Sequence, residues 1–151
     1  MTLAPTGSGE LLEHVETDRD DDPHPMLTLV IRIPVRIADD AAESRAATLS
    51  VRLMHPEVDD WRAAEHRTYR FDGSTRRYTK ADGETIALDD VFGGLRTDSE
   101  HFNVAVAQVA FGAFDGTGLP AHIEGTVRST GAQAPFALDA LLLPGRQPSN
   151  G

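Results

Sequence analysis

Two stretches of the chain alternate regularly between apolar and mixed positions. From Leu27 to Ile37 every second residue is a leucine, isoleucine or valine, and residues 48–54 repeat the pattern over a shorter length. Strict alternation predicts β-strands that turn one face to a core and the other to water. We therefore expect strands at 26–37 and 48–54. Pro34 lies within the first, and because it cannot donate a ladder hydrogen bond it indicates an edge position or a bulge.

A third alternating stretch, from 102 to 111, changes phase partway along. Its apolar residues are even-numbered up to Val106 and odd-numbered from Val109. One extra residue in a strand, a β-bulge, shifts the alternation in this way. We predict one long central strand here, with a bulge near Ala107 or Gln108.

Asp-Gly pairs predict the turns between shorter strands. A two-residue hairpin turn needs positive φ, which Gly adopts freely and Asp tolerates. The pairs are Asp72-Gly73, Asp82-Gly83 and Asp115-Gly116. The strands expected around these turns and towards the C-terminus span 67–71, 76–80, 84–88, 122–129 and 136–143. The first three would form a meander that places Tyr69 and Tyr78 in adjacent strands, and we expect residues 89–100 to form a long loop.

These elements predict an all-β fold. One short helix is expected at 57–65, because Pro56 suits a first helical position and acidic residues follow it. About eight strands with one helix are typical of a single antiparallel β-barrel, calycin-like, or of a β-sandwich. Long bulged strands and consecutive hairpins suit closure, so we favour the barrel.

The length of 151 residues fits one domain. We predict an acidic, flexible N-terminal arm at 1–25, a β-barrel domain at 26–144 and a frayed C-terminal tail at 145–151. The acidic run at 18–22 favours the flexible arm, since like charges repel. The alternative is an arm that packs across the barrel through its apolar side chains, Leu11, Leu12 and Val15.

Composition excludes several classes of function. The formal net charge of −10 repels a phosphate backbone unless a local basic patch overcomes it. The absence of cysteine excludes disulfides, thiolate nucleophiles and sulfur-ligated metals. The histidines show no metal-binding spacing, and neither a nucleophile elbow nor a phosphate-binding glycine loop is present. We expect no metal, no cofactor, no nucleic-acid partner and no membrane partner, and we expect a cytoplasmic location because Met1–Gly9 has no signal-like pattern.

Three polar residues near the C-terminus are candidates for chemistry. His122 and Glu124 point to the same face of a predicted strand. They would form an acid-base pair if that face lined a barrel interior, and would be ordinary surface groups otherwise. Asp139 lies in an apolar run and therefore needs a partner, for which Arg52 and Arg128 are candidates. An ion pair that joins two strands is the structural alternative.

The predicted helix and first hairpin gather aromatic residues that could close one mouth of a barrel. We expect a small-molecule-binding β-barrel. The more specific hypothesis is a cofactor-independent cyclase or isomerase of bacterial secondary metabolism that acts on a hydrophobic substrate. In this hypothesis Glu124 and Asp139 are catalytic, and the residues that bind the substrate are Trp61, Tyr69, Tyr78 and His122. The aromatic residues could equally form a small core under the helix.

The alternative function is a non-enzymatic interaction or structural module, such as an adaptor, an immunity protein or a phage-type protein. A homo-oligomer is compatible with either function. An enclosed apolar cavity of a few hundred cubic ångströms would favour the small-molecule hypothesis, and a fully packed interior would argue against it.

The segment from Ile123 to Ala140, IEGTVRSTGAQAPFALDA, resembles the C-terminal hairpin of the bacterial polyisoprenoid-binding, lipocalin-like family. The resemblance covers 18 residues. The secretion signal and the opening strand features of that family are missing from this chain.

Overall fold

The computed structural model describes residues 2–17, 25–39, 42–54, 56, 58–71, 75–79, 85–89, 91–129 and 132–145. These residues form β-strands and one short 3₁₀ helix, η1. The strands are β1 (Thr2–Pro5), β2 (Gly9–Thr17), β3 (Pro25–Asp39), β4 (Ala42–Leu53), β5 (Thr68–Arg70), β6 (Thr75–Thr79), β7 (Thr85–Asp89), β8 (Val91–Arg96), β9 (His101–Phe111), β10 (Leu119–Ser129) and β11 (Ala132–Gly145).

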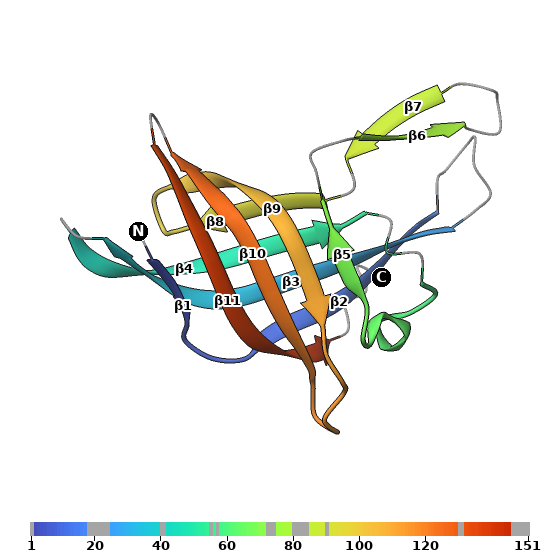
Figure 1. Ribbon diagram of the computed structural model, residues 1–151, viewed down its shortest axis with the longest axis horizontal. Coiled ribbons are helices and arrows are strands. Elements are labelled where there is room, and N and C mark those ends of the chain that lie inside the picture. The colour runs from blue at the N-terminus through green and yellow to red at the C-terminus, as the bar shows by residue number, and fades with distance from the viewer. Residues whose placement is uncertain are drawn as a thin grey trace.

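The predicted barrel is confirmed. Among the described strands, seven close a ring in the order β3, β2, β11, β10, β9, β8 and β4, and β4 returns to β3. An odd number of strands cannot alternate in direction all the way round, so one pair must be parallel, and that pair is β11 with β2. β1 pairs with β3 beyond the end of β2, and β5 pairs with β9 beyond the end of β8. In Figure 1, β9, β10 and β11 cross in front of β2, β3 and β4.

Much of the stretch predicted as an N-terminal arm forms barrel strands. In β2, Leu11 is fully buried and Leu12 is nearly so. β1 and β2 lie end to end along β3, and Pro34 lies opposite the break between them, where its carbonyl accepts a hydrogen bond from Thr6 N–H at 2.9 Å. The N–H that Pro34 lacks would face the same break, so the proline costs the sheet little. The acidic run at 18–22, the side chain of Val15 and residues 146–151 of the tail lie outside the described part of the structure.

The barrel interior is a packed core. Each of the seven ring strands contributes an inward side chain with no water-accessible surface: Leu11, Leu29, Leu49, Leu95, Val109, Ile123 and Leu142. A cavity wide enough for a water molecule would leave accessible surface on the side chains around it. These side chains therefore border no such cavity, and the part of the interior that they form does not offer the enclosed site expected for a ligand.

The bulge in β9 lies where the phase change predicted it. Two successive residues of β10, Glu124 and Gly125, pair with Gln108 and Val106, which leaves Ala107 as the extra residue. The apolar residues on both sides of Ala107 consequently face the core. A local departure from alternation was enough to locate this feature.

The prediction of a long loop at 89–100 was wrong, because β8 occupies Val91–Arg96. Its two glycines are strand residues that allow close contact. A Cβ atom on Gly93 would lie 2.7 Å from the Val104 carbonyl oxygen, and one on Gly94 would lie 3.0 Å from the His101 ring. A glycine within a strand often marks such a close contact. Here Gly93 and Gly94 allow β8 to pack closely against β9 and complete the ring.

The Asp115-Gly116 pair lies in a turn, but Asp115 is the first residue of this turn and not one of its two central residues. Gly116 has φ +96°, and the Asp115 carboxylate accepts hydrogen bonds from Thr117 N–H at 2.7 Å and Gly118 N–H at 2.8 Å. These backbone hydrogen bonds, Gly118 first, lower the pKa of Asp115. The other two Asp-Gly pairs lie outside the described residues.

The predicted meander is only partly present. β6 and β7 pair with each other in a separate two-stranded sheet, whereas β5 pairs with β9. Tyr69 and Tyr78 therefore do not lie in adjacent strands, although the sequence predicted that they would. The helix expected at 57–65 is reduced to the 3₁₀ helix η1 (Trp61–Ala64), where the Asp60 carboxylate accepts a hydrogen bond from Ala63 N–H at 2.9 Å.

Candidate functional site

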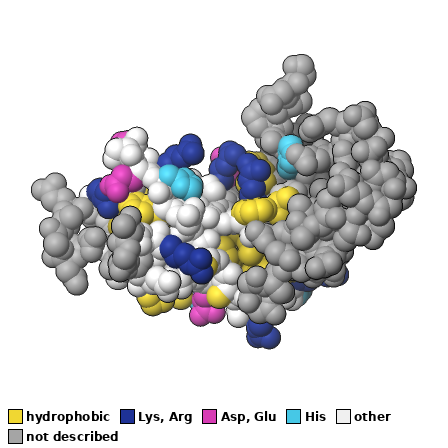
Figure 2. Space-filling model, turned by 90° about the horizontal axis from the view of Figure 1, so that it is seen from above, with side chains coloured by type: hydrophobic (Ala, Val, Ile, Leu, Met, Phe, Trp, Pro, Cys, Tyr) yellow, Lys and Arg dark blue, Asp and Glu magenta, His cyan; other side chains and the backbone are white. Residues whose placement is uncertain are grey.

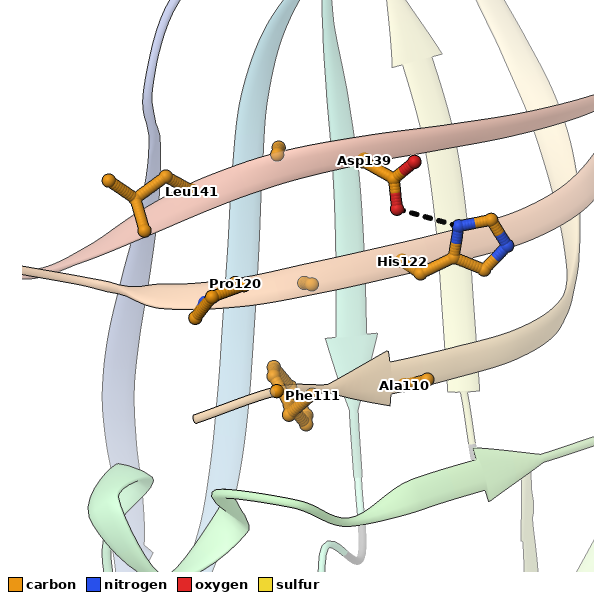
Figure 3. A pocket seen from close by; sticks show the side chains of 9 residues that line it. Ala110, Phe111, Pro120, His122, Asp139 and Leu141 are labelled. Carbon is orange, nitrogen blue, oxygen red and sulfur yellow. Dashed lines mark hydrogen bonds and ion pairs between the residues drawn. The ribbon is translucent and has the colours of Figure 1, made fainter. Parts of the chain in front are cut away.

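An open groove crosses the outer face of β9, β10 and β11 near one end of the barrel. Its volume is about 440 Å³. The residues that line it are Ala110, Phe111, Gly112, Pro120, Ala121, His122, Asp139, Ala140 and Leu141. Figure 3 shows His122 and Asp139 pointing toward each other, with Pro120 and Leu141 farther along the same two strands. The groove thus has an apolar floor and one polar group of residues at its side.

Strand register brings the polar residues together. On β10, His122 pairs with Ala110 of β9 and with Asp139 of β11, so the three residues share one row across the wall. The apolar neighbours Ile123 and Leu138 are buried in the core. Because side chains alternate along a strand, burying these neighbours turns His122 and Asp139 outward.

His122 lies between two carboxylates. Its Nδ1 atom is 2.8 Å from Asp139 Oδ1, and its Nε2 atom is 3.6 Å from Glu124 Oε1. The hydrogen bond to Asp139 raises the pKa of His122 above its usual value; partial burial opposes the shift, and Glu124 adds to it. The side chains of His122 and Asp139 are 37% and 83% exposed. The imidazolium form of His122 is therefore more favoured than that of an ordinary histidine, in a site that water reaches.

The structure decides between the two readings of His122 and Glu124 and corrects one expectation about Asp139. His122 and Glu124 are close together on the outer face of the barrel, which was the alternative to lining its interior. Asp139 does have a partner, but this partner is His122, whereas we had considered Arg52 and Arg128. A single strand shows which residues share a face, but only the position of the core decides which face is inside.

The predicted aromatic residues lie elsewhere. The Trp61 ring packs on Phe114 at a centroid distance of 5.4 Å, and the Tyr69 and Phe111 rings lie nearly perpendicular to each other at a centroid distance of 6.1 Å. Tyr69 Oη also donates a hydrogen bond to the Pro56 carbonyl at 2.6 Å. Neither Trp61 nor Tyr69 lines the groove, and the side chain of Tyr78 lies outside the described part of the structure.

Residues 58–71 form a segment, which we call the cap, and its side chains Val58, Trp61, Ala64, Tyr69 and Phe71 pack in or against the core. The Glu13 carboxylate of β2 accepts a hydrogen bond from Trp61 N–H at 2.8 Å, and Glu65 accepts one from Phe114 N–H. The Arg62 guanidinium lies 4.1 Å from the centre of the Phe114 ring, a cation–π contact. Trp61 and Tyr69 are partly buried against the core. These contacts fit the small core that was the alternative to a ligand-binding mouth.

The sequence did not reveal the small and apolar residues of the groove. Ala110, Pro120 and Leu141 come from three strands and Gly112 follows the end of β9, and none forms a motif with its sequence neighbours. Their only shared signal is strand register, which a single stretch of sequence does not reveal.

Two features of the described residues bear on other functions. No group of three or more histidine, aspartate or glutamate side chains there is arranged to hold a metal ion. No described helix is both long and apolar enough to cross a lipid bilayer.

Comparisons with protein-family models, curated proteins and solved structures found no match to this chain.

Proposed function

We propose that this protein binds a hydrophobic small molecule in the groove on the outer face of β9, β10 and β11. The groove itself supports the proposal, because its volume of about 440 Å³ falls in the usual range for ligand sites. An apolar floor beside a few convergent polar groups is also typical of such sites. The packed interior supports an outer site over an inner one.

The charges at the groove favour some ligands over others. A protonated His122 between the Asp139 and Glu124 carboxylates leaves an excess of negative charge, and a neutral His122 leaves more. The net charge of the chain, −10, has the same sign. A ligand with an apolar body and a cationic or hydroxyl end is therefore favoured over a carboxylate.

The cyclase or isomerase activity stays a prediction. Proton transfer is the chemistry that the site could supply, and His122, whose pKa the Asp139 carboxylate raises, is the group that would carry the proton. Glu124 and Asp139 would then hold the imidazole in place and stabilise its protonated form, in addition to the catalytic roles predicted for them from the sequence. The groove is open to water, which favours binding over a reaction that needs an enclosed site.

The same openness favours a second candidate function, an interaction module that uses the groove to dock another protein. Such a partner would leave the groove with little affinity for small compounds. The two candidates therefore predict opposite results in a direct binding experiment.

Three compounds with one naphthyl skeleton test the proposal: an amine, an alcohol and a carboxylate. Isothermal calorimetry should show binding of the amine and the alcohol and much weaker binding of the carboxylate. Ala110→Phe fills the groove and should weaken amine binding at least about tenfold. Ala46→Phe makes the same change at an exposed position of β4 and should leave it unchanged.

Failure of all three compounds to bind would contradict the small-molecule proposal and favour the interaction module. Equal binding by Ala110→Phe and the unchanged protein would place the ligand outside the groove.

A further inference from the structure

The wall formed by β9, β10 and β11 carries few charges. Over the whole length of these three strands, the ionisable side chains are His101, His122, Glu124, Arg128 and Asp139. His101 and Arg128 lie at the end of the wall away from the groove, and Arg128 is about 20 Å from His122 along β10. The face on the side of β8 differs, since Figure 2 shows basic side chains there beside apolar ones. Of the side chains on these three strands, His122 is thus the one cation at the groove.

Neighbouring strands contribute charges of both signs to the surroundings of this wall. On β5, Arg70 donates a hydrogen bond to the side-chain oxygen of Gln108 at 3.4 Å, and Gln108 pairs with Glu124. On β2, Glu10 pairs with Leu143 of β11. The charges that contact the His122 ring itself are therefore those of its own strand and of β11.

The cap brings a second histidine to the groove. His66 donates its backbone N–H to the carbonyl of Gly112, which lines the groove, at 3.2 Å. The next residue, Arg67, accepts a hydrogen bond from Phe111 N–H at 2.8 Å through its carbonyl. The side chains of His66 and Arg67 are exposed. His66 is thus a titratable group on another element, against which the role of His122 can be tested.

The charge beside the groove depends on whether His122 holds its second proton. The Nδ1 atom lies 2.8 Å from Asp139, and Nε2 lies 3.6 Å from Glu124. The shorter contact holds the Nδ1 proton more firmly, so Nε2 is the atom that loses its proton first. Neutral His122 then offers Nε2 as a hydrogen-bond acceptor beside two carboxylates, whereas an ammonium group brings hydrogen-bond donors and a positive charge.

We propose that His122 determines the class of ligand that the groove accepts: a cationic ligand binds in exchange for the Nε2 proton, and a hydroxyl ligand binds without this exchange. The inference rests on the proposed function, because it requires the groove to bind a ligand. The cation replaces the proton as the positive charge beside Asp139 and Glu124, and the proton passes to the solvent. Water reaches the site, so the proton has a path out.

The exchange fixes the direction in which affinity changes with pH. Asp139 chiefly, and Glu124 in addition, raise the pKa of His122, whereas a bound cation lowers it. By reciprocity, the cation binds more tightly once His122 has lost its proton. At a site open to water, two positive charges about 5 Å apart correspond to a change in affinity of roughly four- to tenfold.

Isothermal calorimetry of the full chain with the naphthyl amine tests the exchange. The amino group is attached through a methylene carbon, so that it stays charged across the pH range, as a lysine side chain does. Titrations in phosphate and in Tris, whose ionisation enthalpies differ, give the number of protons released per ligand. We expect the amine to release about 0.4 proton at the pH of largest release, and the naphthyl alcohol close to none. The amine should bind roughly four- to tenfold more tightly at about pH 8.5 than at about pH 5.5.

Two variants separate His122 from the other histidine at the groove. His122→Gln keeps a polar side chain that does not titrate, so it should abolish the proton release and equalise the amine affinity at the two pH values. His66→Asn is the matched control, since asparagine, like histidine, tolerates the φ of +65° at this position. It should keep both the proton release and the pH dependence. A purely structural role of His122 would instead weaken amine and alcohol alike and leave the proton release in place.

Several results would overturn the proposal. One is equal proton release by the amine and the alcohol, and another is a pH dependence that His66→Asn abolishes and His122→Gln retains. Both results would leave the proposed function intact, because the compounds still bind. Binding of neither compound would contradict the proposed function and the proton exchange together.

Discussion

Adjacent residues on β10 and β11 lie in opposite environments. Ile123 has no accessible surface, whereas the side chain of His122 is 37% exposed beside the groove. On β11, Leu142 is likewise fully buried, while Leu141 lines the groove. The inner face of these strands holds the barrel together, and the outer face of the same strands carries the candidate site. Stability and binding can therefore be changed separately, by substituting alternate residues.

The largest expected effect is on stability at the inner face. Ile123→Ala should lower the free energy of unfolding by about 2 to 5 kcal/mol, because it leaves a cavity in a packed core. His122→Ala, one residue away, should change it by less than about 1 kcal/mol. Urea unfolding of both variants measures the difference, and equal losses would show that the two faces are not distinct.

A smaller effect is expected from adding volume to the inner face. A Cβ atom on Gly125 would lie 2.6 Å from the Ala105 carbonyl oxygen and 3.2 Å from the Phe136 ring. Gly125→Ala should therefore cost about 1 to 3 kcal/mol of stability. Gly7→Ala is the matched control, since nothing lies within 4 Å of its Cβ position. Thermal unfolding that ranks the two variants the other way would mean that the interior has unfilled space.

The smallest effect concerns the outer face and its pH dependence. The pKa of His122 is raised in the folded protein, chiefly by Asp139, so its stabilising contribution is present in full below pH 6.5 and is lost as pH rises through the folded pKa. Asp139→Asn should lower the pKa of His122 in an NMR titration and should destabilise the protein more at pH 6 than at pH 9. If His122 had the same pKa in both proteins, Asp139 would not be the residue that raises it.

Local patterns in the sequence predicted the fold well. Alternation predicted β3 and β4, and the phase change located the bulge at Ala107, because both depend on which residues of one strand face the core. The stretch Val91–Arg96 was mistaken for a loop, since Gly93 and Gly94 usually disfavour strands and only the neighbouring strands explain them. β1 and β2 were missed because the acidic run beside them dominated the interpretation of residues 1–25.

The sequence predicted parts of the candidate site but not its location. It singled out His122 and Glu124 as a pair on one strand face and Asp139 as a residue that needs a partner, and the structure places the three together. It could not show that they face outward, nor that Ala110 and Leu141 lie beside them, because both facts depend on pairing between strands.

The most direct test of the outer site is methyl NMR of Leu141, Leu142 and Ile123 during a titration with the naphthyl amine. We expect the Leu141 methyl signals to shift as the compound binds, together with the His122 ring signals. The methyl signals of Leu142 and Ile123, which face the packed core, should hardly move. Larger shifts at Leu142 and Ile123 than at Leu141 would place the ligand inside the barrel and contradict this account.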